Sequence, residues 1–523
     1  MEPSGGAIAV KRAKPSDDGA GAGEDLLGKL PDDILVLILR HLDTAAAGQT
    51  SVLSRRWRRV WALLPELRFT SSLKPHLIAS ALVNHEAALR CLLVDTLDAA
   101  PASVTELLAA AVPRLSGRLV FQNRVPGMNA GDGGEEEARE GGAFELPCLE
   151  KATSVYLDLG FLGLAVPPAG VFARLKKLYL TLVRLHGPCE LGDAVSSARC
   201  PCLERLSVRD TTGLSNLVIH SESLLTVVLG FMDGLRELTI VAPALQELEL
   251  FCCFGKYQPV ANISTPQLVS LIWRDTYDPS SVQFGSLGQL QDLSTSVFCV
   301  YGRNDSRKNR SFLWFLERFQ VLHNLQITLL YPLHIGNFPY LMKDLTVLPC
   351  FEVLTIFLNN NGHAFGASLF HILRICSRLK ALTLVLHSGF KQHSLVGMSL
   401  VDSIDNDGVT TKKAPSACPS GCICDEPTNW KTEDLTLYCL EEVEINMSGA
   451  DHEVAFLKRL FSWATVLKRM KINFDYSISE SKVRQLRQTV SSFSRPEIHL
   501  EFYLYHDSML WHLLAPEDHG NGL

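Results

Sequence analysis

The chain has 523 residues, of which 47% are hydrophobic and 20% charged, and its formal net charge at pH 7 is −7. This length suits two or three domains with a large core, and the negative charge argues against a nucleic-acid partner. We expect no membrane span, because no run of about 18 apolar residues occurs, and reduced thiols for the 14 cysteines, because no signal-peptide pattern is present.

The N-terminal residues 1–23 are rich in Gly, Ala and Asp, and we expect them to form a disordered tail. The basic run KRAK at residues 11–14 is compatible with a weak nuclear-import signal, but a solvated tail is the better interpretation. We therefore expect the protein in the cytoplasm, the nucleus or both. Three further polar stretches predict surface loops: residues 127–143, 301–311 and 391–417.

Residues 30–44, LPDDILVLILRHLDT, are unusually apolar, since eight of the fifteen are Leu, Ile or Val. Pro31 at the first helical position and acidic residues in the first turn favour a helix here. Such a helix must be covered on more than one side, because apolar side chains surround it: Ile34, Ile38 and Leu42 in one stripe, Leu35 and Leu39 beside it, and Val36 and Leu37 beyond.

A further helix is predicted within residues 52–69, VLSRRWRRVWALLPELRF, with Ser54 as its cap. Val60, Trp61 and Leu64 share one face of it. Three short helices in about 40 residues make a poor independent core, so we expect a partner to supply the missing burial.

Residues 30–65 resemble an F-box, from the LPDDIL opening to the LSRRWRRVW close. The resemblance implies docking to a Skp-type adaptor of a cullin ubiquitin ligase. It also implies the adaptor contacts: Leu30, Pro31, Ile34, Leu35, Ile38, Leu39, Leu53, Ser54 and Trp57. Two alternatives remain, namely an ordinary helical subdomain and a grip on DNA phosphates. The latter is weak in an acidic protein without a base-reading helix, although four arginines are at hand: Arg55, Arg56, Arg58 and Arg59.

The frame L-x-x-L-x-L recurs along the chain, often with Pro two residues before it, as after Pro201, Pro243, Pro266 and Pro349. Its alternating end predicts a short strand with apolar side chains on one face, and Pro fits the strand's start because it has no N–H for the ladder. Stacked units share a continuous core. We predict that six leucines are buried on equivalent strands of one curved stack: Leu206, Leu238, Leu248, Leu271, Leu354 and Leu382.

The spacing of the frame is irregular. It is 28 residues from Leu175 to Leu203, but only ten or eleven through the four leucines at positions 214, 224, 235 and 245. A ten-residue step has no room for a strand plus a helix, so we predict extended return segments there and a coil of about 21 residues. Helices are predicted at residues 311–325 and 367–382. The pattern resembles irregular plant leucine-rich repeats over residues 145–390 and again after 435.

Residues 418–474 resemble the FBD region found behind F-box and leucine-rich repeats in plant proteins. The matched pieces are the Cys-Pro start, Pro427, Asn429-Trp430, the LEEVEI strand, and DHEVAFLKRLFSWATVLKRMKI with the preceding Gly449. The pattern predicts strand, loop, amphipathic helix and strand, which would close the end of the stack. One face of this helix carries Phe456, Leu460 and Trp463.

Cys418, Cys422 and Cys424 suggest zinc, but no fourth ligand follows at finger-like spacing, because Cys439 lies fifteen residues on and His452 further still. We therefore expect these thiols to shape a loop and expect neither a metal nor another cofactor.

The chain contains no Walker loop, G-x-S-x-G, H-E-x-x-H or dinucleotide motif, so we expect no catalytic site. We predict an α/β protein in which a three-helix F-box precedes an irregular leucine-rich-repeat solenoid that the FBD region closes. The predicted division is a disordered tail (1–23), the F-box (24–66), a linking helical region with an acidic loop (67–144), leucine-rich repeats (145–417), the FBD region (418–500) and a C-terminal tail (501–523).

We interpret the chain as the substrate receptor of a Skp–cullin–F-box ubiquitin ligase, which recruits an unknown protein target on its repeat surface. Nucleic acid and membrane are not expected partners. The alternative is a leucine-rich-repeat scaffold or ligand sensor that does not act in ubiquitination.

Overall fold

The computed structural model describes residues 27–70, 73–125, 142–186, 190–255, 257–303, 307–386, 418, 422–426, 428–475, 478–506 and 510–513. The predicted N-terminal tail with its basic run, most of the acidic loop and the whole loop at 391–417 lie outside these residues. None of the helices in the described ranges has both the length and the apolarity needed to cross a bilayer.

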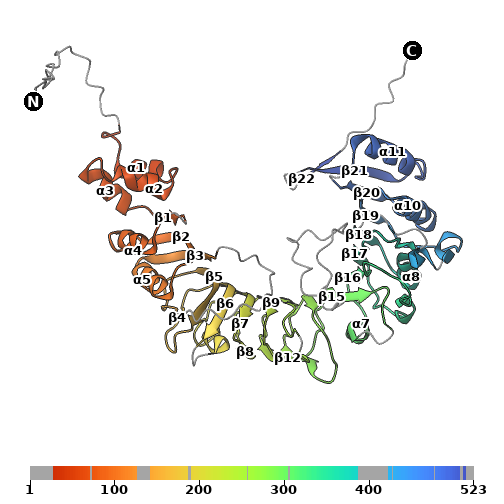
Figure 1. The fold of residues 1–523 in the computed structure, drawn as a ribbon, viewed down its shortest axis with the longest axis horizontal. Helices are drawn as coiled ribbons and strands as arrows, with labels where there is room; N and C mark the ends of the chain where they lie inside the picture. The colour runs from red at the N-terminus through yellow and green to blue at the C-terminus, as the bar shows by residue number, and fades with distance from the viewer. Residues whose placement is uncertain are drawn as a thin grey trace, which may run out of the picture.

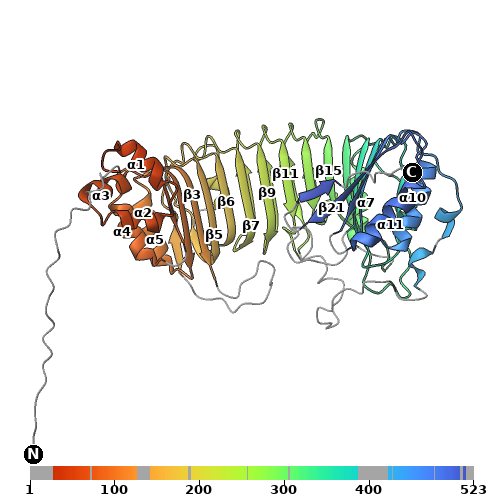
Figure 2. The same cartoon turned by 90° about the horizontal axis from the view of Figure 1, so that it is seen from above.

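The described chain forms a long arc (Figure 1). Its inner, concave side is one sheet of 18 strands, and helices and a second, four-stranded sheet lie on the outer side. Figure 2 shows the strands of the large sheet side by side along the length of the molecule. Each coil therefore contributes one strand to the concave face and returns along the convex face, as expected for a repeat solenoid.

The strands of the large sheet are β1 (Glu66–Phe69), β2 (Leu89–Leu97), β3 (Leu115–Arg124), β4 (Ala143–Glu145), β5 (Ser154–Ala165), β6 (Lys177–His186), β7 (Arg205–Thr212), β9 (Thr226–Met232), β11 (Glu247–Phe251), β13 (Ser270–Arg274), β15 (Asp292–Cys299), β16 (Asn324–Leu330), β17 (Val353–Asn359), β18 (Ala381–Leu386), β19 (Glu442–Met447), β20 (Arg469–Phe474), β21 (His499–His506) and β22 (Leu510–Leu513). Neighbouring strands pair in parallel, except that β22 pairs antiparallel with β21. The second sheet holds β8 (Asn216–His220), β10 (Glu237–Val241), β12 (Val260–Ser264) and β14 (Val282–Phe284).

The helices are α1 (Asp32–Leu39), α2 (Thr44–Thr50), α3 (Arg55–Ala62), α4 (Pro75–Val83), α5 (Pro101–Ala111), α6 (Leu191–Ala194), α7 (Arg307–Glu317), α8 (Gly366–Ile375), α10 (Asp451–Trp463) and α11 (Glu480–Ser491). Short 3-10 helices are η1 (Met342–Asp344), η2 (Ile423–Asp425) and η3 (Thr428–Lys431). The predicted helices at 311–325 and 367–382 correspond to α7 and α8, but each ends earlier because the next strand begins inside the predicted range.

Repeat leucines stack in register through the core of the arc. Leu206 pairs with Val227 of the next strand, Val227 pairs with Leu248, and Leu248 pairs with Leu271. Further along the sheet, Leu354 pairs with Leu382. All six leucines singled out in the sequence are buried. Leu238, however, lies on β10 of the second sheet, so the prediction of equivalent strands is wrong for this residue. The ten-residue spacing between successive frames explains why Leu238 lies on the other sheet. Ten residues take the chain only halfway round a coil, so alternate frames fall on the convex face, where extended return segments were predicted.

The large sheet begins before the predicted repeat boundary at residue 145. Residues 67–144 contain the expected helices α4 and α5, but β1, β2 and β3 already belong to the sheet. β1 and β2 carry the frame with Phe69 and Val94 at its last position, and β3 has one extra residue between Leu115 and Leu119, so the predicted repeat region began too late. The predicted C-terminal tail is also wrong in part, because β21 continues to His506 and β22 pairs with it.

Candidate functional site

Helix α1 divides its apolar side chains between two environments. Leu35 and Leu39 are each 1% exposed and belong to the hydrophobic core, together with Val60 of α3. Ile34, on the other hand, is 40% exposed on the outer face of the helix. The exposed residues of this unit, named here the F-box apolar face, are Ile34, Leu37, Ile38, Leu42, Val52 and Leu53. Figure 1 shows α1–α3 at the free N-terminal end of the arc, where the remaining described chain approaches them only from the side of β1.

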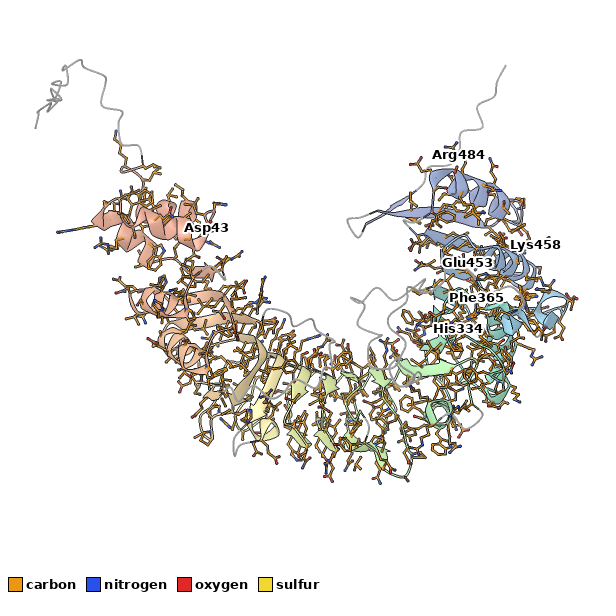
Figure 3. The ribbon with its side chains drawn as sticks, viewed as in Figure 1. Asp43, His334, Phe365, Glu453, Lys458 and Arg484 are labelled. Atoms are coloured by element: carbon orange, nitrogen blue, oxygen red, sulfur yellow. The ribbon has the colours of Figure 1, made fainter. Side chains whose placement is uncertain are left out.

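Side-chain caps define the ends of the short helices. Asp43, labelled in Figure 3, accepts a hydrogen bond from the Ala46 amide at 2.6 Å and begins α2. Ser54 accepts one from the Trp57 amide at 3.3 Å and begins α3, as predicted. Such caps contribute about 0.5–2 kcal/mol each, which matters for helices of seven or eight residues.

Charged side chains tie the helices together at their edges. Arg56 donates from Nε to Asp32 at 2.9 Å, and its guanidinium also bonds to the carbonyl oxygens of Gly28 and Leu30. Arg56 therefore holds the chain that leads into α1. The alternative of phosphate binding would therefore depend on the three arginines that are exposed: Arg55, Arg58 and Arg59.

The α1–α3 unit is joined tightly to the start of the sheet. The Arg68 amide of β1 donates to the Thr44 hydroxyl at 2.6 Å. Buried His85 donates from Nε2 to the Leu64 carbonyl at 2.8 Å and meets the Trp61 ring edge-on. Burial lowers the pKa of His85, and its Nδ1 has no hydrogen-bond partner, so the ring is neutral. The core of the three helices is thus continuous with that of the solenoid.

Comparisons with known proteins identify this unit. The family model described as the F-box domain matches residues 27–69. These residues are an F-box domain. A putative F-box/FBD/LRR-repeat protein of Arabidopsis thaliana is 28% identical over 279 residues, covering 50% of this chain and 53% of the relative. A second such protein is 28% identical over 260 residues, or 47% and 51%. An F-box/LRR-repeat protein is 66% identical over 38 residues, or 7% and 8%. All three come from Arabidopsis, and the chain matches at most about half the length of these relatives.

The F-box places the predicted adaptor contacts in three different environments. Ile34, Ile38 and Leu53 are exposed on the F-box apolar face, and Pro31 is also exposed. Leu30 and Trp57 are half-buried against the core, and Ser54 serves as the α3 cap. Leu35 and Leu39, by contrast, are buried in the F-box interior and are not part of its exposed surface. Three further exposed residues of the F-box apolar face were not among the predicted adaptor contacts: Leu37, Leu42 and Val52.

The concave face carries an aromatic platform in its N-terminal half, three strands away from the F-box. Tyr156 of β5 and Tyr179 of β6 are paired in register and stack with ring centroids 4.2 Å apart. The Arg118 guanidinium of β3 lies 4.6 Å from the Tyr156 centroid. These side chains alternate with buried leucines and valines, so they face away from the core. Tyrosine and arginine are the side chains that most often anchor protein partners.

A separate cluster brings together four groups with metal-ligating side chains near the other end of the arc. It comprises His363, Cys418, Cys422 and Cys424, whose donor atoms all lie within 4.8 Å of one another. The sequence-based argument against a metal was the lack of a fourth ligand downstream. That argument fails, because the fourth group precedes the cysteines in the chain and lies in the loop between β17 and α8.

Proposed function

We propose that this protein is a non-catalytic substrate-receptor subunit of a Skp–cullin–F-box ubiquitin ligase. The observation that carries the proposal is the exposed F-box apolar face on a domain that the family model matches. The leucine-rich-repeat relatives support a second role for the solenoid, which is to hold a target protein. We place the protein in the cytoplasm, the nucleus or both.

The energetics of docking are consistent with this role. If six exposed aliphatic side chains each gain about half of the 1.5–3 kcal/mol of full burial, they contribute roughly 5–9 kcal/mol. Association costs about 4–15 kcal/mol, so the aliphatic face alone binds weakly. Half-buried Trp57 and the polar groups at the ends of α1 and α3 must then add to the affinity.

The proposed target surface is the concave face. The Tyr156–Tyr179 platform lies on β5 and β6, in the N-terminal half of that face, so a target bound there lies on the same arm of the arc as the F-box. Receptor action then requires no chemistry by this chain, because tethering raises the effective concentration of the target near a ubiquitin-conjugating enzyme. We further propose that residues 418–500 are the FBD region and that β19, β20 and α10 extend the stack towards its C-terminal end.

The test is co-purification of a plant Skp-type adaptor with the full-length chain. Ile34→Asp and Leu53→Asp each place a carboxylate on the F-box apolar face, which is unfavourable once the face is buried. We expect each to weaken adaptor binding by about 2 kcal/mol or more, roughly thirtyfold. Val347→Asp is the matched control, since Val347 is an equally apolar and exposed residue far from the F-box.

Undiminished adaptor binding by both F-box variants would contradict the docking proposal. The scaffold or sensor alternative makes a different prediction, namely that the wild-type chain does not retain the adaptor at all. Tyr179→Ala tests the two binding functions separately. We expect this variant to bind the adaptor as the wild type does and to bind a target on the concave face more weakly.

A further inference from the structure

Four donor atoms converge on one point beside the C-terminal coils. His363 lies between the end of β17 and the start of α8, and the three cysteines lie in the segment that returns to β19. The His363 Nδ1 atom is 3.2 Å from Cys418 Sγ and 3.5 Å from Cys422 Sγ. Cys418 Sγ is 3.4 Å from Cys424 Sγ. The neighbouring Phe365 is labelled in Figure 3, where it lies between His334 and Glu453 along this arm of the arc.

These separations match a tetrahedral metal site. Zinc bonds of about 2.3 Å to sulfur and about 2.0–2.1 Å to nitrogen place neighbouring ligand atoms about 3.5–3.8 Å apart. The three distances given above are within a few tenths of an ångström of that range, and the other distances between donor atoms of the cluster do not exceed 4.8 Å. The cysteines are free thiols.

The histidine is oriented as a ligand. Its Nε2 lies 3.2 Å from the Leu333 carbonyl oxygen, which can only accept, so Nε2 carries the proton. The Nδ1 lone pair therefore points at the sulfur atoms. A backbone carbonyl that fixes the far nitrogen of a metal-binding histidine is the usual outer-shell arrangement, because it sets both the tautomer and the ring orientation.

The cysteine segment is held on the solenoid by its own contacts. The Ala364 amide donates to Cys424 Sγ at 3.4 Å, a bond that stabilises a thiolate. The single proton of the buried Tyr301 hydroxyl has three carbonyl oxygens of this segment within reach, those of Ile423 at 3.3 Å, Cys424 at 3.4 Å and Glu426 at 3.2 Å. The site is thus shaped by groups from three separate stretches of chain, which favours a preformed position for each donor.

Trp430 anchors the end of the same segment. It is 1% exposed, and its indole lies so close to Gly366 that a Cβ on that glycine would be 2.5 Å from the ring. Its Nε1 donates to Asp425 at 3.2 Å. The tight fit of Trp430 against the first residue of α8 places the cysteines beside the loop that carries His363.

We propose that His363, Cys418, Cys422 and Cys424 bind one structural zinc ion. Three thiolates and one imidazole select a soft, tetrahedral metal, and four protein ligands leave no open position for catalysis. The consequence concerns the chain between β18 and β19. These strands are neighbours in the sheet, yet β18 ends at Leu386 and β19 begins at Glu442. The metal would fasten the returning part of this long excursion to the preceding coil.

The experiment uses the full-length, untagged chain purified with zinc in the buffer. We expect one zinc per chain by elemental mass spectrometry. Replacement of the zinc by Co²⁺ is expected to give the visible and thiolate charge-transfer absorption of a tetrahedral, sulfur-rich site. Cys422→Ser and His363→Ala should each lower zinc affinity by at least about 10–100-fold, since even loss of outer-shell partners costs that much. Cys439→Ser is the matched control, because this thiol follows in the same segment but lies outside the cluster.

Three results would overturn the proposal. The first is a wild-type chain that binds less than stoichiometric zinc and gives no tetrahedral Co²⁺ spectrum. The second is zinc retained equally by all variants, which would place the metal elsewhere. The third is a disulfide between Cys418 and Cys424 in protein purified without reductant and with zinc present. If a ligand variant fails to fold, the Co²⁺ spectrum of the wild-type chain decides the matter by itself.

Discussion

The two ends of the arc carry similar apolar helices that are covered in opposite ways. Phe456 and Trp463 of α10 are buried, and their rings pack against Phe365 and Phe370 of the adjacent coil. Ile38 of α1 stays exposed, because only one side of α1 packs against the rest of the F-box. The difference shows that apolar content alone does not mark an interface. A helix that its own chain covers contributes to stability, and one that remains open has surface available for a partner.

The largest expected effect is on stability at the C-terminal end. Phe456→Ala removes a fully buried aromatic ring and should lower the free energy of unfolding by about 3–5 kcal/mol. Ile38→Ala, at the exposed counterpart, should change it by less than about 1 kcal/mol. Denaturant unfolding of both full-length variants checks the comparison. Equal losses would mean that α1 is covered as completely as α10.

A second prediction separates the two faces of α1 itself. Leu35→Ala should destabilise the F-box by about 2–5 kcal/mol, because Leu35 lies in the core. Its neighbour Ile34→Ala should leave the F-box folded. Hydrogen exchange of the α1–α3 amides measures the local loss in each variant. The assignment of Leu35 to the core is wrong if that variant keeps wild-type protection but loses the adaptor.

The two ends should also respond oppositely to pH. Burial lowers the pKa of His85 below its ordinary 6.5, so the unfolded chain binds more protons and stability falls as the pH drops through that value. Burial raises the pKa of Glu453, at the start of α10, above its ordinary 4.5. The folded chain then binds more protons, and this contribution to stability falls as the pH rises above 4.5.

The measurement compares wild type with His85→Gln and Glu453→Gln by denaturant unfolding at several pH values. Acidification below pH 6.5 should cost the wild type more stability than His85→Gln. Raising the pH from 4.5 towards 7 should cost the wild type more than Glu453→Gln. A difference that stays constant across pH in either pair would show that the corresponding group does not titrate differently on folding.

The smallest expected effect concerns surface ion pairs. Arg40 bonds to Glu66 at 3.0 Å at the F-box end, and Arg469 bonds to Glu501 at 2.9 Å at the other. All four side chains retain contact with solvent, so Glu66→Gln should cost less than about 1 kcal/mol, and still less at high salt. A loss above 2 kcal/mol in thermal or denaturant unfolding would show that this pair holds the F-box on β1.

The sequence by itself determined the local elements. The F-box pattern, the Ser54 cap and the short strands of the L-x-x-L-x-L frame follow from spacing and residue type over a few positions. The ten-residue steps likewise predicted strands on both faces of the middle coils. These features were predictable because helix and strand periods and caps depend on neighbours in the chain.

Only the tertiary structure decided which residues share a surface. It placed Leu35 inside the F-box and Ile34 outside, moved Leu238 to the second sheet, and brought His363 to three cysteines from a later segment. The physical reason is the same in each case. Burial and ligand geometry depend on contacts between segments far apart in sequence, and the periodicity of one segment contains no information about which other segment will cover it.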